Sequence, residues 1–321
     1  MRIRFTPEVM ADAKSWRLLD RMVMHIEDGR HKWLADNPVE IEASPWMADG
    51  GRSGEANRKA YQEHVRWAAY PEKRFELNVV LNTASERTLS AQDALRSMET
   101  PVYVALENAT GDGGFLVTII MALNRSELWE AWEKRWIALD QMGGFGECEK
   151  TIARLRENIP GPCRIFVLAD SDARFPGENT ATVQKVTQSC HAAGAAFAIL
   201  NKRKIENYLP VSVLNRLNRR QDRTVFNAFL NLNSDQRSHY EMKHGFDGDA
   251  LGAAIVPAEQ AALFAGVRSA VLDDLCGGFG GHIADRFVSD RAQIMEIDIR
   301  QVCDTNPTEL DQILDQIEGL L

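Results

Sequence analysis

Several features that define large classes of protein are missing from this sequence. Its five cysteines are scattered, odd in number and without C-x-x-C spacing, so the pattern indicates neither a disulfide framework nor a zinc site. No run approaches the roughly 18 apolar residues of a membrane span. The first residues, MRIRFTPEVMADAKSW, lack the apolar segment of an export signal. We therefore expect a cytoplasmic protein with no membrane partner.

Positive charge is also in short supply. The chain has 37 Lys and Arg residues against 46 Asp and Glu residues, a formal net charge of -9. This balance argues against bulk attraction to nucleic acid, and any contact with nucleic acid must be local. The ATP-binding pattern G-x-x-x-x-G-K-[ST] does not occur, and Gly277 to Gly281 has no following lysine, as expected for a turn or hinge. If ATP takes part, a partner protein hydrolyses it.

The chain of 321 residues is 45% hydrophobic, which is enough for a sizeable core and about two domains. Its apolar pattern divides it into three parts. Residues 1–95 form a mixed, mostly helical N-terminal segment, residues 96–250 an α/β core, and residues 251–321 a helical C-terminal segment.

The N-terminal segment is predicted from three patterns. Apolar residues recur at steps of three and four from Pro7 to about Leu34, which indicates an amphipathic helix, and a second helical pattern runs from about 54 to 69. Residues 75–81, FELNVVL, have the character of a strand. Ser90 can cap a short helix that ends near Met98.

Strands and helices alternate regularly in the core. Continuous apolar strands separated by helices are typical of a parallel sheet that is covered on both faces. The predicted strands are 101–107, CRIFVLAD and AAFAIL; the predicted helices are 112–123, a Trp-rich helix 124–141, 147–158 and 180–194. Beyond Pro210 the pattern is helical, with clusters at 211–232, 258–276 and 307–321.

Two of the predicted strands end in acidic residues. VYVALE ends at Glu107, with Asp112 five residues further on, and RIFVLADSD ends at Asp170 and Asp172. Ligands of open parallel sheets bind outside the carboxyl ends of the strands. The D-x-D spacing on an extended segment would turn both aspartates to one side, with Ser171 turned away.

Converging carboxylates repel one another unless a cation compensates them. A hard divalent ion suits such a cluster, because it takes oxygen ligands and leaves positions for water and phosphate. The acids therefore predict metal-dependent phosphate chemistry. The alternative is that each acid only caps the helix that follows it.

A third polar element, LNKRKIENYLP, follows the last predicted strand. It brings the positive charges of Lys202, Arg203 and Lys204 next to Glu206. Taken alone it is equally typical of a solvated basic turn at the start of a helix.

Together these three motifs resemble a TOPRIM domain, in particular the branch of OLD-family nucleases and stand-alone phage-defence proteins, over roughly residues 100–245. The resemblance implies that Glu107 is a general acid/base or metal ligand, and that Asp170 and Asp172 bind Mg²⁺. Asp112 resembles the second acid of the first motif, and Glu206 an ordered acid beside the site.

The resemblance also has departures. Asn108 stands where glycine usually follows the glutamate, and Asp112 lies five residues on instead of four. The segment DQRSHYEMKHGF resembles the part of this nuclease branch that supplies a lysine, and Lys243 is the matching residue. The resemblance implies that Lys243 offsets charge on the scissile phosphate or on the leaving oxygen. OLD proteins carry an ATPase domain in the same chain, whereas this chain has no such motif.

These observations lead us to expect a Mg²⁺- or Mn²⁺-dependent nuclease with one or two ions, acting on DNA in preference to RNA, with RNA left open as a substrate. Lys202 and Arg203 are expected to bind phosphate. We expect a role in anti-phage defence or DNA processing with a separate ATPase, and self-association stays open. The alternatives are a non-catalytic TOPRIM-like subunit and a small-molecule phosphohydrolase. A topoisomerase or a primase would need parts that the sequence does not show.

Overall fold

The computed structural model describes residues 1–34, 37–48, 52–64, 75–157, 159–248 and 256–321. Its N-terminal part contains a parallel sheet in the order β2-β1-β3-β4. These strands are β1 (Arg2–Phe5), β2 (Lys32–Trp33), β3 (Glu76–Val80) and β4 (Thr88–Ser90). Only β3 was predicted from the sequence pattern, which makes this segment richer in strands than expected.

Helices pack around this small sheet. The predicted helix from Pro7 to Leu34 is divided into α1 (Pro7–Ala11) and α2 (Trp16–Glu27), followed by β2, so its continuous form is wrong. The helix predicted from 54 to 69 corresponds to α5 (Arg52–His64), and residues 65–69 lie outside the described residues. Ser90 caps α6 (Ala91–Glu99) as predicted, because its Oγ accepts the backbone N–H of Asp93 at 3.2 Å. The remaining helices here are α3 (Pro38–Glu42) and α4 (Pro45–Ala48).

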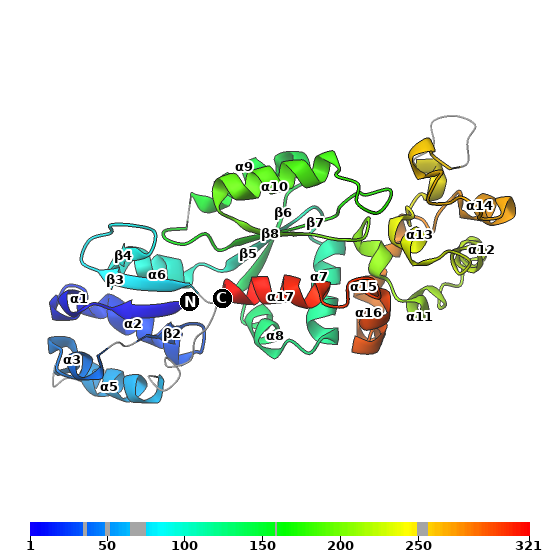
Figure 1. Cartoon of the computed structure of the whole chain (residues 1–321). Coiled ribbons are helices and arrows are strands. Elements are labelled where there is room, and N and C mark those ends of the chain that lie inside the picture. Colours follow the sequence, from blue (N-terminus) through cyan, green and yellow to red (C-terminus); the bar gives the residue numbers. More distant parts are fainter. Residues whose placement is uncertain (35–36, 49–51, 65–74, 158, 249–255) are drawn as a thin grey trace.

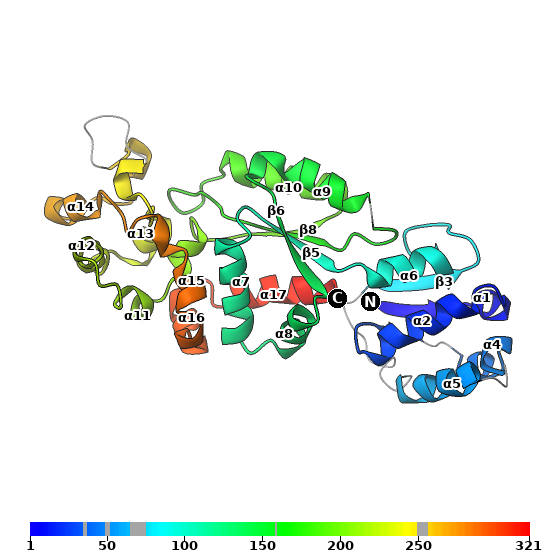
Figure 2. The ribbon, with the colours of Figure 1, turned by 180° about the vertical axis from the view of Figure 1, so that it is seen from behind.

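The central sheet is parallel and has the order β6-β5-β7-β8. Its strands are β5 (Val102–Leu106), β6 (Ile137–Gln141), β7 (Ile165–Ala169) and β8 (Ala196–Ile199). One face is covered by α7 (Gly111–Ala122), α8 (Ser126–Glu133) and α17 (Glu309–Gly319), the other by α9 (Cys148–Arg156) and α10 (Ala181–Ala193), as Figures 1 and 2 show. The predicted α/β class, with a parallel sheet between helical layers, is confirmed.

The side chains of β7 explain why its whole run is apolar. Phe166 and Leu168 face the core beneath α7 and α17, whereas Ile165, Val167 and Ala169 face the core beneath α9 and α10. All five residues are buried, because successive side chains of a strand point to opposite faces and both faces are covered.

The prediction of one Trp-rich helix over residues 124–141 is wrong. The helix α8 ends at Glu133, Arg135 adopts the left-handed backbone conformation with φ 58°, and Ile137 begins the edge strand β6. Trp129 and Trp132 are partly buried against the core. Trp136, which follows the end of α8, packs against the same core as Trp129 and Trp132. The spacing of the tryptophans therefore reflects contact with one core and not a single helix.

The C-terminal half beyond β8 consists of short helices, in agreement with the expected helical character. In chain order they are η3 (Ile205–Tyr208), α11 (Val211–Leu214), α12 (Arg220–Phe229), α13 (Ser234–His239), η4 (Gly245–Gly248), η5 (Ala258–Gln260), α14 (Ser269–Leu275), η6 (Gly281–Ile283), α15 (Arg286–Ser289), η7 (Arg291–Gln293) and α16 (Glu296–Val302), before α17. In the described part of the chain, none of the helices has the length and apolar character needed to cross a membrane.

A fully buried arginine joins the N-terminal part to the central sheet. The guanidinium of Arg164 donates to the carbonyl oxygens of Ser97 at 3.0 Å, Thr100 at 2.9 Å and Leu320 at 2.9 Å. Burial lowers the pKa of Arg164 to about 9. Three backbone segments are thus fixed to one another at the base of β7.

Candidate active site at the carboxyl edge of the central sheet

The two acidic strand ends are neighbours in the sheet. β5 pairs with β6 on one side and with β7 on the other. Glu107 directly follows β5 and Asp170 directly follows β7. From β5 the chain goes to β6 on one side, and β7 and β8 are then added on the other side. The acids therefore lie at the point where the strand order reverses, which is where open parallel sheets bind ligands.

The turn after β5 is built by Asn108. Its Oδ1 accepts the backbone N–H groups of Thr110 at 2.9 Å and Gly111 at 3.2 Å, which satisfies free donors at the start of α7. The backbone N–H of Asn108 in turn donates to Asp112 Oδ2 at 2.9 Å. The side chain of Asn108 therefore caps α7, and the five-residue spacing brings Asp112 back to the strand end.

The extended conformation predicted for Asp170 to Asp172 is wrong at Asp172. β7 ends at Ala169, and Asp172 has a left-handed backbone with φ 52°. Asp172 Oδ2 accepts the hydroxyl of Thr182 at 2.9 Å, and Asp170 Oδ1 accepts the backbone N–H of Ile205 at 3.0 Å. A left-handed non-glycine residue is strained, as residues at functional sites often are.

The third motif brings a buried glutamate and a lysine to the same place. The side chain of Glu206 is 1% exposed, and Lys243 Nζ lies 2.7 Å from its Oε1. The buried Oε2 has no hydrogen-bond partner among the described residues. A buried carboxylate oxygen without a partner is costly, so an additional cation or water would stabilise it.

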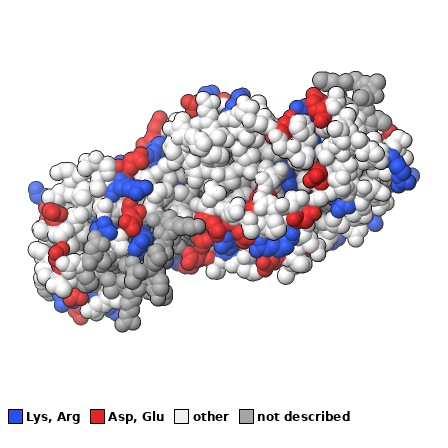
Figure 3. Space-filling model, in the orientation of Figure 1, with Lys and Arg blue, Asp and Glu red and all other residues white. Residues whose placement is uncertain are grey.

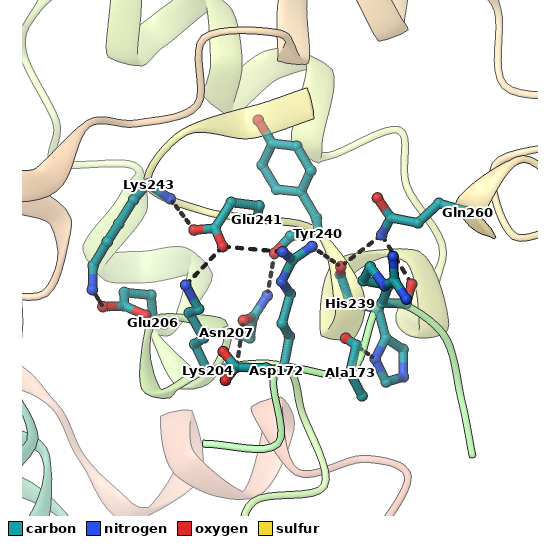
Figure 4. A network of polar contacts seen from close by, with 12 residues as sticks. Asp172, Ala173, Lys204, Glu206, Asn207, His239, Tyr240, Glu241, Lys243 and Gln260 are labelled. Carbon is teal, nitrogen blue, oxygen red and sulfur yellow. Dashed lines mark hydrogen bonds and ion pairs between the residues drawn. The ribbon is translucent and has the colours of Figure 1, made fainter. Parts of the chain in front are cut away.

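A second glutamate holds two further cations (Figure 4). Glu241 Oε2 lies 2.9 Å from Lys204 Nζ and 3.3 Å from an Nη of Arg203, and the backbone N–H of Lys243 donates to Glu241 Oε1 at 3.2 Å. Asn207 ties the segment in place, since its amide donates to the carbonyl of Tyr240 at 2.9 Å. Lys204 and Lys243 are thus positioned by one buried glutamate each.

The electrostatics show that the acids share one environment. Burial first, then the charges of Glu206, Asp112 and Asp172, raise the pKa of Asp170 well above its ordinary value. Burial also raises the pKa of Asp112 to about 6, helped by Glu206 and Glu107 and opposed by the bond from Asn108.

The pKa of Glu107 is raised by partial desolvation and by Asp172. The structure therefore brings together all five predicted acids and Lys243. Raised carboxylate pKa values in a group of acids at the strand ends of a parallel sheet are typical of functional sites.

The two residues expected to bind phosphate are both buried. Lys202 is buried, its Nζ lies 5.4 Å from the centre of the Tyr208 ring, and burial lowers its pKa. Arg203 is buried against Glu241. This arrangement presents neither cation to an incoming phosphate, and the phosphate role of both residues stays a prediction.

Glu241 and Thr182 are site residues that the sequence motifs did not single out, whereas Lys204 was named there only for its positive charge. Glu241 lies two residues before Lys243 in the sequence. Thr182 holds Asp172 from the first turn of α10. Only the fold places these residues beside the acids.

The acids do not form a ready-made coordination shell. Within the described ranges, no three His, Cys, Asp or Glu side chains are grouped closely enough to hold one ion as they stand. A metal bound here would require side-chain movement. The orphaned oxygen of Glu206 and the mutual repulsion of the acids are the features that fit a cation.

Comparison with known proteins leaves the site as the basis for assigning a function. No family model, curated protein or solved structure matches this chain.

Proposed function

We propose that this protein is a TOPRIM-type, metal-dependent phosphodiester hydrolase that cuts DNA. The observation that carries the proposal is the convergence of Glu107, Asp112, Asp170, Asp172 and Glu206, with Lys243, at one edge of a parallel sheet. Negative charge of this density, partly compensated by lysines, suits a site for a divalent cation and a phosphate.

Mg²⁺ or Mn²⁺, as one or two ions, would be held by Asp170, Asp172 and Glu206, with Glu107 and Asp112 completing the set. Such an ion lowers the pKa of an attacking water and polarises the phosphate. Glu107, the acid at an exposed position, would accept a proton from that water.

The chain's own cations supply the charge that a phosphate needs. Burial opposes the charged form of Lys243 and Lys204, but Glu206 and Glu241 respectively outweigh it, so the pKa of each lysine is raised. Their side chains remain 31% and 24% exposed. Both ammonium groups can therefore neutralise a phosphate oxygen or the leaving oxygen.

The cellular setting follows from the resemblance and from the motifs present. A TOPRIM core without an ATP-binding loop of its own is proposed to work with an ATPase partner in trans, in anti-phage defence or DNA processing in the cytoplasm. Self-association is compatible with the same scheme.

The second candidate is a non-catalytic TOPRIM-like subunit that binds an ATPase or nucleic acid. The specific observation in its favour is that no three of the described acids are arranged to hold an ion as they stand. In this case Lys204 and Lys243 would serve as fixed counter-ions that stabilise the fold.

A panel of substrates separates the candidates. Wild-type protein is incubated with Mg²⁺ or Mn²⁺ and supercoiled plasmid, structured RNA or mononucleotides, with EDTA as the control. The nuclease proposal predicts metal-dependent nicking of plasmid and no phosphate release from mononucleotides. Phosphate release without nicking would identify a small-molecule phosphohydrolase, and inactivity on every substrate, with and without an added ATPase, would favour the scaffold.

A further inference from the structure

Three arginines with exposed side chains lie together at the start of α12. Arg219, Arg220 and Arg223, here called the α12 arginine patch, form no ion pair with an acid among the residues that the structure describes. An Nη of Arg219 lies 3.3 Å from His282 Nδ1, and Arg223 donates to the carbonyl of Asn215 at 2.7 Å. Their positive charge is therefore available to solvent.

Two acids in this region are buried, each against a basic side chain. Asp222, in the same turn, is buried with its carboxylate 3.5 Å from His282 Nε2. Asp290 is buried as well and is shared by Arg216 and Arg286, each at 3.2 Å. The exposed acids of the neighbouring helix α14, Asp273 and Asp274, limit the patch on that side.

A single segment connects the patch to the acid cluster. The backbone N–H of Gly280 donates to the carbonyl of Lys243 at 2.8 Å, and Ala284 contacts the start of α7 at Gly111, where an added Cβ would lie 3.6 Å from the Cβ of Ala284. His282, between these two anchors, is the residue that meets Arg219. Gly280 and His282 are separated by at most about 7 Å of backbone.

We propose that the α12 arginine patch binds the phosphate backbone of the DNA that enters the acid cluster. This inference rests on the proposed nuclease function and names how the site captures its polymer. Guanidinium groups suit phosphates because they present several donors in a fixed plane. Small groups of both signs alternate over the described part of the face in Figure 3, and the chain carries a net charge of -9, so attraction must come from a local patch of this kind.

The test is DNA binding measured without catalysis. Fluorescence anisotropy of a labelled duplex is recorded in EDTA at several salt concentrations for wild type, for Arg220→Gln/Arg223→Gln, and for the control Lys14→Gln/Arg17→Gln. The control removes the same charge from exposed positions at and before the start of α2, at the opposite end of the molecule (Figures 1 and 2). Thermal unfolding of each variant verifies that it is folded.

The patch variant should bind at least tenfold more weakly than wild type, and its plot of log K against log salt should be less steep by about 2, since two phosphate contacts are lost. The control should bind as wild type does. Equal affinities and slopes for the two double variants, or no binding by wild type, would overturn the inference. Nicking assays run in parallel separate the two proposals, because weakened binding without metal-dependent nicking would retain the patch and reject the nuclease.

Discussion

At the scale of single residues, the site is held by short polar contacts that have individual causes. Asn108 caps α7 and directs its own N–H at Asp112, and Ile205 donates its N–H to Asp170. These bonds hold Asp112 and Asp170 where burial and the charges of neighbouring acids raise the pKa of both carboxylates. The folded protein thus tolerates repulsion that an unfolded chain does not experience.

Asp112→Asn should stabilise the metal-free protein at neutral pH. The pKa of Asp112 is raised to about 6, so the folded protein holds a proton there up to higher pH than the unfolded chain does. The free energy of unfolding therefore falls as the pH rises through the window from about 4 to about 6. The substitution keeps a side-chain oxygen that can accept the Asn108 N–H. It should raise the free energy of unfolding by up to about 3 kcal/mol at pH 7.

The measurement is urea unfolding at pH 4 and pH 7 in EDTA. The matched control is Asp298→Asn, because Asp298 accepts the N–H of Met295 at 3.0 Å at the start of α16 in the same way but lies outside the acid cluster. The control should not gain stability. A loss of stability in Asp112→Asn at pH 7 would show that Asp112 is not under repulsion from the other acids.

At the scale of elements, the strands and helices that could be predicted are those with an apolar pattern that runs through the whole element. β5 and β7 are apolar on both faces, and α7, α9 and α10 follow them at regular intervals. β6 was missed because tryptophans spaced for a helix lead directly into it. β2 has two residues and β4 three, too few to show a period in the sequence.

The residues of the site divide in the same way. Glu107, Asp112, Asp170, Asp172, Glu206 and Lys243 could be proposed from position after strands and from motif resemblance. The left-handed backbone of Asp172 and the pairing of Lys204 with Glu241 could not, because the first depends on the loop that meets Arg203 and the second on contacts between segments far apart in the sequence.

Two glycines, Gly245 and Gly278, allow the backbone just after Lys243 to lie against the backbone of residues 275–278. Gly245 has φ 60°, and a Cβ there would lie 2.5 Å from the backbone nitrogen of Gly278 and closer still to the carbonyl oxygens of Leu275 and Cys276. The predicted turn or hinge at Gly277 to Gly281 is therefore a tight packing partner of the segment that carries Lys243. Side chains larger than hydrogen do not fit between the two backbones.

Gly245→Ala should destabilise the protein by about 3 kcal/mol or more, since backbone strain and overpacking act together. Gly266→Ala provides the control, because Gly266 also has a positive φ, 83°, but no atom lies within 4 Å of its added Cβ. Strain alone should cost the control about 1–2 kcal/mol. Equal losses for both variants in urea unfolding would contradict the close approach.

At the scale of the whole molecule, two parallel sheets are joined around buried polar contacts. The N-terminal sheet has its own apolar core, and Arg164 links its last helix to the base of β7 and to the C-terminal helix. The predicted strand at 75–81 gave no sign of the partner strands, because their pairing joins residues 2–5 to residues far along the chain. The acid cluster lies at the carboxyl end of β7, away from this joint, with the α12 arginine patch beyond it (Figure 1).

The most direct test of the central claim is a plasmid-nicking assay with Mg²⁺ or Mn²⁺ on wild type, Asp170→Asn and the control Glu309→Gln. Glu309 is also buried, but it accepts the hydroxyl of Tyr208 at 2.6 Å and is not one of the clustered acids. Wild type and the control should nick in a metal-dependent manner, and Asp170→Asn should lose at least a hundredfold in rate, as expected when a metal ligand is removed. Metal-dependent nicking that survives Asp170→Asn unchanged would contradict the assignment of the site.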